Sequence, residues 1–250
     1  MTDNHAQLTK GSGACRWAVR LAIASLALLV AGLAAGQLGV GPFVAMLTIT
    51  AATLVAIIAG ITGAIGLLRS GGSGAGSGVG LVWLAVILGV AGIANTAARM
   101  GAGGAPIHDI STDTADPPAF VAVAELRGPN DNPAEYAGPE TAAQQAAAYP
   151  DLQTLVLADP YSLVFATALE VAERMGWEIV ASDANAGRIE ATATTPFVGF
   201  KDDVVIRIRD RSPQTLVDVR SKSRLGMGDM GVNAKRIRDY TGQLVAALEP

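Results

Sequence analysis

The residues best suited to chemistry lie late in the chain, where a basic strand meets a turn rich in glycine. Arg220 to Lys222 end a predicted strand, Arg224 to Gly231 form the turn, and a helix begins near Val232. Free backbone N–H groups at a helix start attract anions, and glycines let a ligand approach the backbone closely. The segment therefore predicts a site for an anionic small molecule, a lipid headgroup or a partner. Its candidate residues are Lys222, Arg224, Asp229, Asn233 and Arg236.

A structural role explains the same segment without a ligand. Asp229 would cap the helix or pair with Arg224 or Arg236 to hold the turn, and the glycines would serve backbone geometry alone. The run contains no GxxxxGK[ST] phosphate loop, and Gly226, Gly228 and Gly231 match GxGxxG in spacing alone, which is a weak motif by itself. The signal for a ligand is therefore weak, and both interpretations stay open.

A second candidate segment contains His108, the one histidine outside the N-terminal tail, with Asp109 and Asp113 close by in sequence. A hydrolase of the Ser-His-Asp type would have to be built around this histidine, but no GxSxG motif lies nearby. The acids alternate like the start of a calcium loop. However, the sixth position is Thr114 instead of Gly and the twelfth is Phe120 instead of Glu. Neither a catalytic residue nor a metal or cofactor site is therefore assigned.

Predicted strands and helices must position these residues. The strands alternate apolar and polar side chains, as half-buried strands do, and the helices carry apolar residues on one face. Strands are expected at about 154–157, 177–181, 188–194, 203–210 and 215–222, and helices at about 139–148, 160–175 and 232–248. The fold class that follows is α+β, with an antiparallel sheet covered on one face by two helices.

The other face of the predicted sheet carries charges of both signs. Its residues are Arg188, Glu190, Arg207, Arg209, Asp218 and Arg220. We expect them to form cross-strand ion pairs that face water, with docking of a partner on this face as the alternative.

The first third of the chain is apolar enough to cross a membrane. No charged residue or histidine occurs from Leu21 to Leu68, or from Ser70 to Ala98. A run of about 18 or more apolar residues spans the hydrocarbon layer as a helix, so three transmembrane helices are expected at about 17–38, 43–68 and 79–98. A cleaved signal peptide in place of the first span is the alternative, although it would leave the other two.

Basic residues near the spans predict the orientation. Lys10, Arg16 and Arg20 precede the first span and Arg69 separates the second from the third, whereas Arg99 follows the third. The larger number of basic residues on the N-terminal side favours a cytoplasmic N-terminus. Three crossings then place the residues after Arg99 outside the cytoplasm. The chain would divide into a cytoplasmic tail (1–16), the spans (17–98), a linker with a Pro-rich segment (99–120) and an extracytoplasmic α+β domain (121–250).

Charge and small residues limit the partners. Residues 106–250 carry thirteen Lys or Arg against twenty-one acids, which argues against nucleic acid. Apart from Arg20 near the start of the first, the spans contain no ionisable residue, which argues against a transporter. Gly32 and Gly36 form a GxxxG pair, and glycine recurs at Gly60, Gly63 and Gly66. Such faces pack the helices of one chain or join two copies in a homo-oligomer.

Several motifs after the spans resemble the domain of unknown function 1499 family. They are His108-Asp109-Ile110-Ser111-Thr112-Asp113 with Asp116-Pro117-Pro118, Gly176-Trp177, Arg188-Ile189-Glu190-Ala191, Phe200-Lys201-Asp202-Asp203, and Arg220 to Arg224 with Gly228-Asp229. They fall in order over about 108–248, and the three-span start resembles that of bacterial members. The resemblance implies a bacterial envelope protein in the inner membrane, with a periplasmic or otherwise extracytoplasmic domain. It implies no activity.

Three functions are compatible with these observations. The first is a binding or interaction module that holds an anionic small molecule, a lipid or an envelope protein near 222–236. The second is an envelope hydrolase that uses His108 and nearby acids, and the third is a membrane scaffold. A cavity that joins 108–120 to 220–237 would favour the first two.

Overall fold

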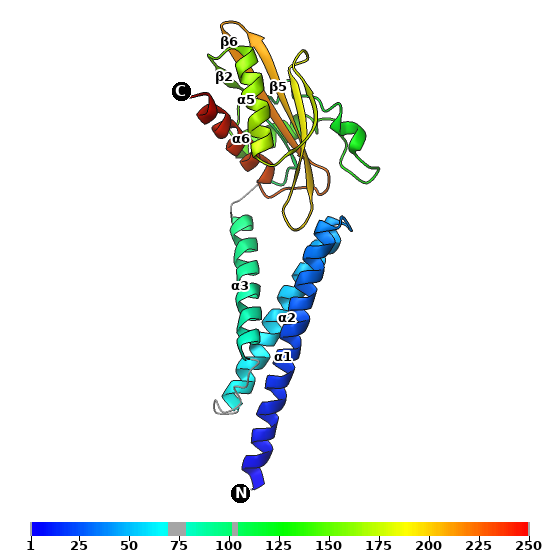
Figure 1. Ribbon diagram of the computed structural model, residues 1–250, viewed down its shortest axis with the longest axis vertical. Coiled ribbons are helices and arrows are strands. Elements are labelled where there is room, and N and C mark those ends of the chain that lie inside the picture. Colours follow the sequence, from blue (N-terminus) through cyan, green and yellow to red (C-terminus); the bar gives the residue numbers. More distant parts are fainter. Residues whose placement is uncertain (1, 70–78, 102–104, 250) are drawn as a thin grey trace. The chain divides into compact units, whose positions relative to one another are not determined.

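The computed structural model describes residues 2–69, 79–101 and 105–249 (Figure 1). It divides into two compact units: the helices within Met1–Gly101, and a domain of Ala102–Thr195 with Phe200–Pro250. The Gly/Ser loop expected at 70–78 and residues 102–104 of the expected linker lie outside the described residues.

The first unit consists of three helices: α1 (Thr2–Gln37), α2 (Pro42–Arg69) and α3 (Val79–Gly101). Gly39 and Gly41 adopt positive φ angles of 69° and 138° in the turn between α1 and α2, which glycine permits at little cost. The helix α1 begins at Thr2, so the predicted N-terminal tail is helical. Once a helix is nucleated, each further residue adds one hydrogen bond.

Two helices, rather than the three predicted, are long and apolar enough to cross a membrane among the described residues. These segments are Gly13–Gln37 and Pro42–Gly66, and 22% of an 18-residue apolar window in each is buried. The apolar stretch of α3, Val82–Ala94, is shorter, and the polar pair Asn95-Thr96 follows it. A signal sequence, or the core helix of a soluble protein, would pass the same test of length and composition.

Small residues allow these helices to pack closely. A Cβ atom on Gly60 would lie 2.3 Å from Val86 Cγ2, and one on Gly63 would lie 2.9 Å from Val82 Cγ1. The Ser25 hydroxyl donates to the Ala52 carbonyl at 2.9 Å. These two glycines therefore serve packing within one chain, the first of the two roles expected for them.

The second unit is an α+β domain around an antiparallel sheet, as predicted. The strands are β1 (Asp109–Ser111), β2 (Leu155–Leu157), β3 (Glu178–Asp183), β4 (Arg188–Thr194), β5 (Lys201–Arg211) and β6 (Gln214–Ser223). The other elements are a 3₁₀ turn η1 (Val123–Leu126) and the helices α4 (Pro139–Ala148), α5 (Tyr161–Arg174) and α6 (Val232–Leu248). The strand order in the sheet is β1-β6-β5-β4-β3. Strand β2 also pairs with β6, at residues 215–217, whereas β1 pairs with residues 220–222.

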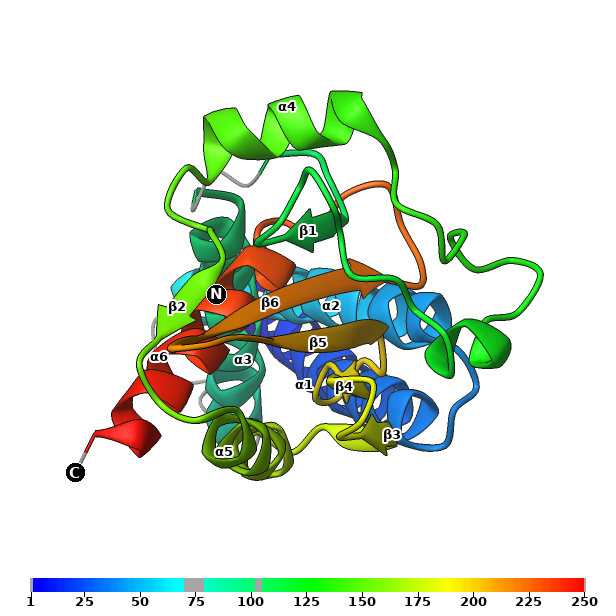
Figure 2. The same cartoon turned by 90° about the horizontal axis from the view of Figure 1, so that it is seen from above.

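The apolar face of this sheet forms the core. Val204, Ile206 and Val219 are fully buried there, and α5 and α6 cover them (Figure 2). Tyr240 of α6 donates to the Ala168 carbonyl of α5 at 2.9 Å, which joins the two helices. The two-helix cover and the alternation of the strands are both confirmed.

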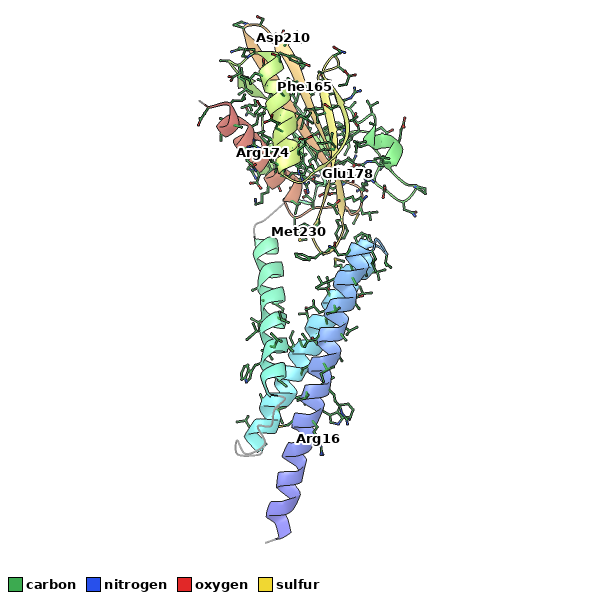
Figure 3. The ribbon with its side chains drawn as sticks, viewed as in Figure 1. Arg16, Phe165, Arg174, Glu178, Asp210 and Met230 are labelled. Atoms are coloured by element: carbon green, nitrogen blue, oxygen red, sulfur yellow. The ribbon has the colours of Figure 1, made fainter. Side chains whose placement is uncertain are left out.

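The long β5–β6 hairpin extends from one end of the domain to the other. Asp210 lies at its turn and Met230, before α6, lies at the opposite end (Figure 3). Strand β1 was expected to be part of the linker. It belongs to the sheet because Asp109, Ile110 and Ser111 pair with residues 222, 221 and 220 of β6.

Candidate functional site

The charged face of the sheet is mostly buried, contrary to the prediction that it faces water. Of the six predicted residues, only three stay partly exposed: Arg188, Arg207 and Arg209. Glu190 and Asp218 are fully buried and Arg220 is 2% exposed. The segment after β1 crosses this face. Within it, the backbone N–H groups of Val121 and Val123 donate to Glu190 Oε2 at 2.9 and 3.0 Å. A strand pattern cannot distinguish a solvated charged face from one that a loop covers.

Besides Glu190, three buried aspartates organise this face, and Asp109 is the first of them. Arg220 donates to its two oxygens from Nε and Nη2 at 2.8 and 2.9 Å, and Lys222 Nζ lies 3.1 Å from Oδ2. The guanidinium lies over the rings of Phe120 and Tyr136, 4.5 and 5.3 Å from their centroids. Aromatic faces stabilise a cation that has lost its water.

Burial changes the proton affinities around Asp109. Desolvation lowers the pKa of Lys222, and the Asp109 charge opposes that effect. Burial, followed by the charge of Asp109, raises the pKa of Tyr136 to about 12. The tyrosine is therefore neutral at physiological pH.

Asp203 of β5 is the second of these buried aspartates. Arg224 donates to it from Nε at 3.0 Å and from Nη2 at 2.8 Å, and Arg127 Nη2 lies 2.9 Å away. The Thr192 hydroxyl donates to Oδ1 at 3.0 Å. Four cations therefore surround the two carboxylates Asp109 and Asp203.

Backbone carbonyls compensate the excess positive charge. Lys222 Nζ donates to the Glu135 carbonyl at 2.6 Å, and Arg220 donates to the carbonyls of Pro118 and Ala134 at 3.1 and 2.9 Å. Arg224 donates to the Leu126 carbonyl at 3.2 Å. All four carbonyls belong to the segment that covers the face, so these cations fix the segment to the sheet.

Asp218 of β6 is the third of these buried aspartates and lies nearer the hairpin turn. Arg207 and Arg209 each donate to its Oδ2 from Nη2, at 2.9 and 2.7 Å, and the Thr154 hydroxyl donates to Oδ1 at 2.6 Å. Asp113 joins this group, 3.1 Å from Arg207. The covering segment is therefore bound by ion pairs near both ends of the face.

The start of α6 is also satisfied internally. Asp229 accepts the backbone N–H of Gly231 at 2.9 Å and of Asn233 at 2.6 Å, while its carbonyl accepts the N–H of Val232 at 3.2 Å. Burial raises the pKa of Asp229, and these hydrogen bonds oppose the shift. The helix start offers none of these three donors to an external anion.

The remaining predicted residues have different partners from those considered in the sequence. Arg236 Nη2 donates to Asp202 at 2.6 Å and Arg224 pairs with Asp203, so neither pairs with Asp229. The Asn233 amide accepts from Ser221 Oγ at 2.6 Å. All five candidate residues thus bind groups of the domain itself, which supports the structural interpretation of this segment.

The second candidate segment does not converge on one site. His108 Nδ1 lies 3.3 Å from the Met227 carbonyl oxygen, whereas Asp109 faces Arg220 and Asp113 faces Arg207. Within the described ranges, no group of three or more His, Cys, Asp or Glu is arranged to hold a metal.

A family model matches the segment in which these pairs lie. The model, described as protein of unknown function (DUF1499), covers residues 109–244. The protein belongs to the DUF1499 family. The matched residues begin at β1 and end in α6, so they include the whole sheet and the segment over its charged face. No curated protein matches the sequence.

The DUF1499 domain also has a groove that sequence reasoning missed. It lies between residues 151–156, at the start of β2, and one side of α6, with a volume of about 650 Å³. Its lining includes Leu152, Leu155, Val156, Thr241, Gly242 and Val245. One residue in the sequence could have indicated it. Gly242 interrupts a helical pattern, and glycine within a helix lowers helix stability by roughly 1 kcal/mol relative to alanine.

Proposed function

We propose that this protein is a membrane-anchored binding module of the bacterial cell envelope. In this proposal α1, α2 and α3 cross the inner membrane and the DUF1499 domain lies outside the cytoplasm. The domain acts by binding a partner and catalyses no reaction.

The exposed apolar surface of the helices is the observation that carries the proposal. Leu47 of α2 is 70% exposed, and Val30 of α1 and Ile87 of α3 are 65% and 61% exposed. A core helix of a soluble protein would bury such side chains. A signal sequence would account for α1 alone. The third crossing rests on the uncharged part of α3, Val79–Ala98, because its 20 residues reach about 30 Å as a helix.

Orientation rests on the basic residues. Four of the five in the first 105 residues lie before the first span or between the second and third. The positive-inside rule then favours a cytoplasmic N-terminus, and an odd number of crossings favours an extracytoplasmic domain.

The buried ion pairs support a binding role over catalysis. The acids near His108 are bound to arginines, so they are not placed to orient it as a base. An anion at 222–236 would have to displace Asp109, Asp202 or Asp203 from a cation. The groove beside β2 requires no such exchange, so we assign the binding role to it.

Fractionation and reporter fusions test the anchoring. Full-length protein should stay in the membrane pellet after extraction with alkaline carbonate. Alkaline phosphatase fused after Pro250 should be active, and a fluorescent protein that folds only in the cytoplasm should be dark there. Release by carbonate, or the reversed reporter pattern, would contradict the proposal.

A further inference from the structure

We infer that the groove between β2 and α6 binds an extended peptide segment, which adds to the sheet as a strand beside β2. The inference names the partner class for the binding role proposed above. It depends on that role and not on the number of membrane crossings.

Strand β2 offers an edge for such pairing. It pairs with β6 through Leu155, Val156 and Leu157, and among the described residues no strand pairs with its other side. An unpaired edge presents alternate N–H and C=O groups, which another extended backbone complements. Val156 is 51% exposed at this edge, so an apolar contact is available beside the hydrogen bonds.

Helix α6 forms the opposite wall and is open where a ligand would lie. A Cβ atom on Gly242 would meet nothing within 4 Å, so packing within the domain does not require glycine there. A bare helix surface instead allows close approach of another chain. Leu155 and Val245 are half-buried and supply apolar surface on either side.

The side-chain hydroxyl groups of the groove already have partners. Thr154 donates to Asp218 at 2.6 Å and Thr241 donates to the Ile237 carbonyl at 2.9 Å. Arg238 and Asp151 pair with each other at the rim, at 2.6 Å. The backbone of β2 is therefore the main remaining source of hydrogen bonds for a ligand. Backbone hydrogen bonds favour a peptide in an extended conformation and do not require a particular polar side chain.

The dimensions fit a short strand. A volume of about 650 Å³ falls in the range of ligand sites, roughly 300–1,000 Å³. The three residues of β2 extend over about 10 Å, so they would pair with three or four residues of a partner. Alternate side chains of that partner would face the groove and the solvent, so one apolar residue at every second position should be preferred.

A peptide library tests the inference on the full-length protein in lipid nanodiscs. Twelve-residue linear peptides displayed on phage are selected, and the enriched peptides are measured by fluorescence polarisation. We expect enriched sequences that alternate apolar and polar residues and lack proline. The variant Gly242→Leu fills the groove from the helix wall and should weaken binding at least tenfold. Gln243→Leu adds the same side chain at the next, exposed position and should bind like the wild type.

Other outcomes would overturn the inference. No enrichment over empty nanodiscs, or equal binding to Gly242→Leu, would exclude peptide binding in the groove. Self-association in light scattering that Gly242→Leu abolishes, without peptide binding, would make a second copy the occupant. Folding is checked by circular dichroism, and Gly242→Leu should be no less stable, because leucine favours helices. If the reporter fusions give the reversed pattern but the peptides still bind, the proposed membrane anchoring is wrong and the peptide site is not.

Discussion

The two faces of the DUF1499 sheet are both largely buried but are held in different ways. On one face, Ile206 and Val219 pack in an apolar core under α5 and α6, and buried polar contacts such as Ser221–Asn233 lie near the start of α6. On the other, Asp109, Asp203 and Asp218 are fully buried and bind arginines, a lysine and threonines. Apolar packing tolerates small changes of shape, whereas a buried charge depends on one particular partner.

This difference bears on function. Basic residues next to a glycine turn resemble an anion site in sequence, yet here they anchor a covering segment through carboxylates and backbone carbonyls. The partners of these basic residues within the domain favour a structural role for them. The groove beside β2 has the reverse character, with few charges and an open strand edge.

The largest expected effect comes from removing the carboxylate of Asp203. Asp203→Ala leaves Arg127 and Arg224 buried without their counter-ion, and the free energy of unfolding should fall by about 3–5 kcal/mol. Ile206→Val on the other face should cost about 0.5–1.5 kcal/mol. Denaturant unfolding of the full-length protein in micelles, followed by near-ultraviolet circular dichroism, measures both. Similar losses for the two variants would contradict the contrast between the faces.

A double-mutant cycle sharpens the contrast at Asp109 and Arg220. Each single change to leucine leaves the other member of the pair charged, whereas the double change removes both and leaves only Lys222 without its carboxylate. The double variant should lose less stability than the sum of the single losses, with a coupling of about 1–3 kcal/mol. Additive losses would show that the pair is not coupled, and hence that water reaches it.

The pH dependence of stability tests the burial of Lys222. Its pKa in the folded state is lowered by burial below the ordinary 10.5, so between these two values the unfolded state binds more protons. Stability must therefore rise with pH in that window. Compared with Lys222→Met, the wild type should gain stability as pH rises from 8 toward 10.5. The variant Lys235→Met controls for the loss of one positive charge, and a falling difference would contradict burial.

The smallest effect is expected at the rim of the groove. Arg238 bonds lower the pKa of Asp151, so the pair's contribution is present above the ordinary value of 3.8 and is lost as pH falls below it. Both side chains are largely exposed, and Asp151→Ala should change stability by no more than about 0.5 kcal/mol. A loss above 2 kcal/mol in the same unfolding assay would place this pair with the buried ones.

The sequence was informative wherever local pattern determines structure. The alternation over 203–210 and 215–222 predicted β5 and β6, and the apolar faces of 160–175 and 232–248 predicted α5 and α6. The family could also be recognised, from motifs such as Arg220 to Arg224.

Long-range pairing could not be predicted in this way. Asp109 meets Arg220 across 111 positions, and Arg127 meets Asp203 only because the covering segment folds back. Local periodicity carries no information on such contacts. The cap at Asp229 was among the open alternatives, since its partners lie within four residues.

Amine labelling tests most directly whether the charged residues are structural. Full-length protein in nanodiscs is treated briefly with sulfo-N-hydroxysuccinimide acetate, and modification is quantified by mass spectrometry. Lys222 is 2% exposed, whereas the Lys235 side chain is 74% exposed, so Lys235 should react while Lys222 stays unmodified until the protein is denatured. Modification of both lysines at similar rates in the folded protein would show an open, solvent-accessible cationic site and would contradict the buried face.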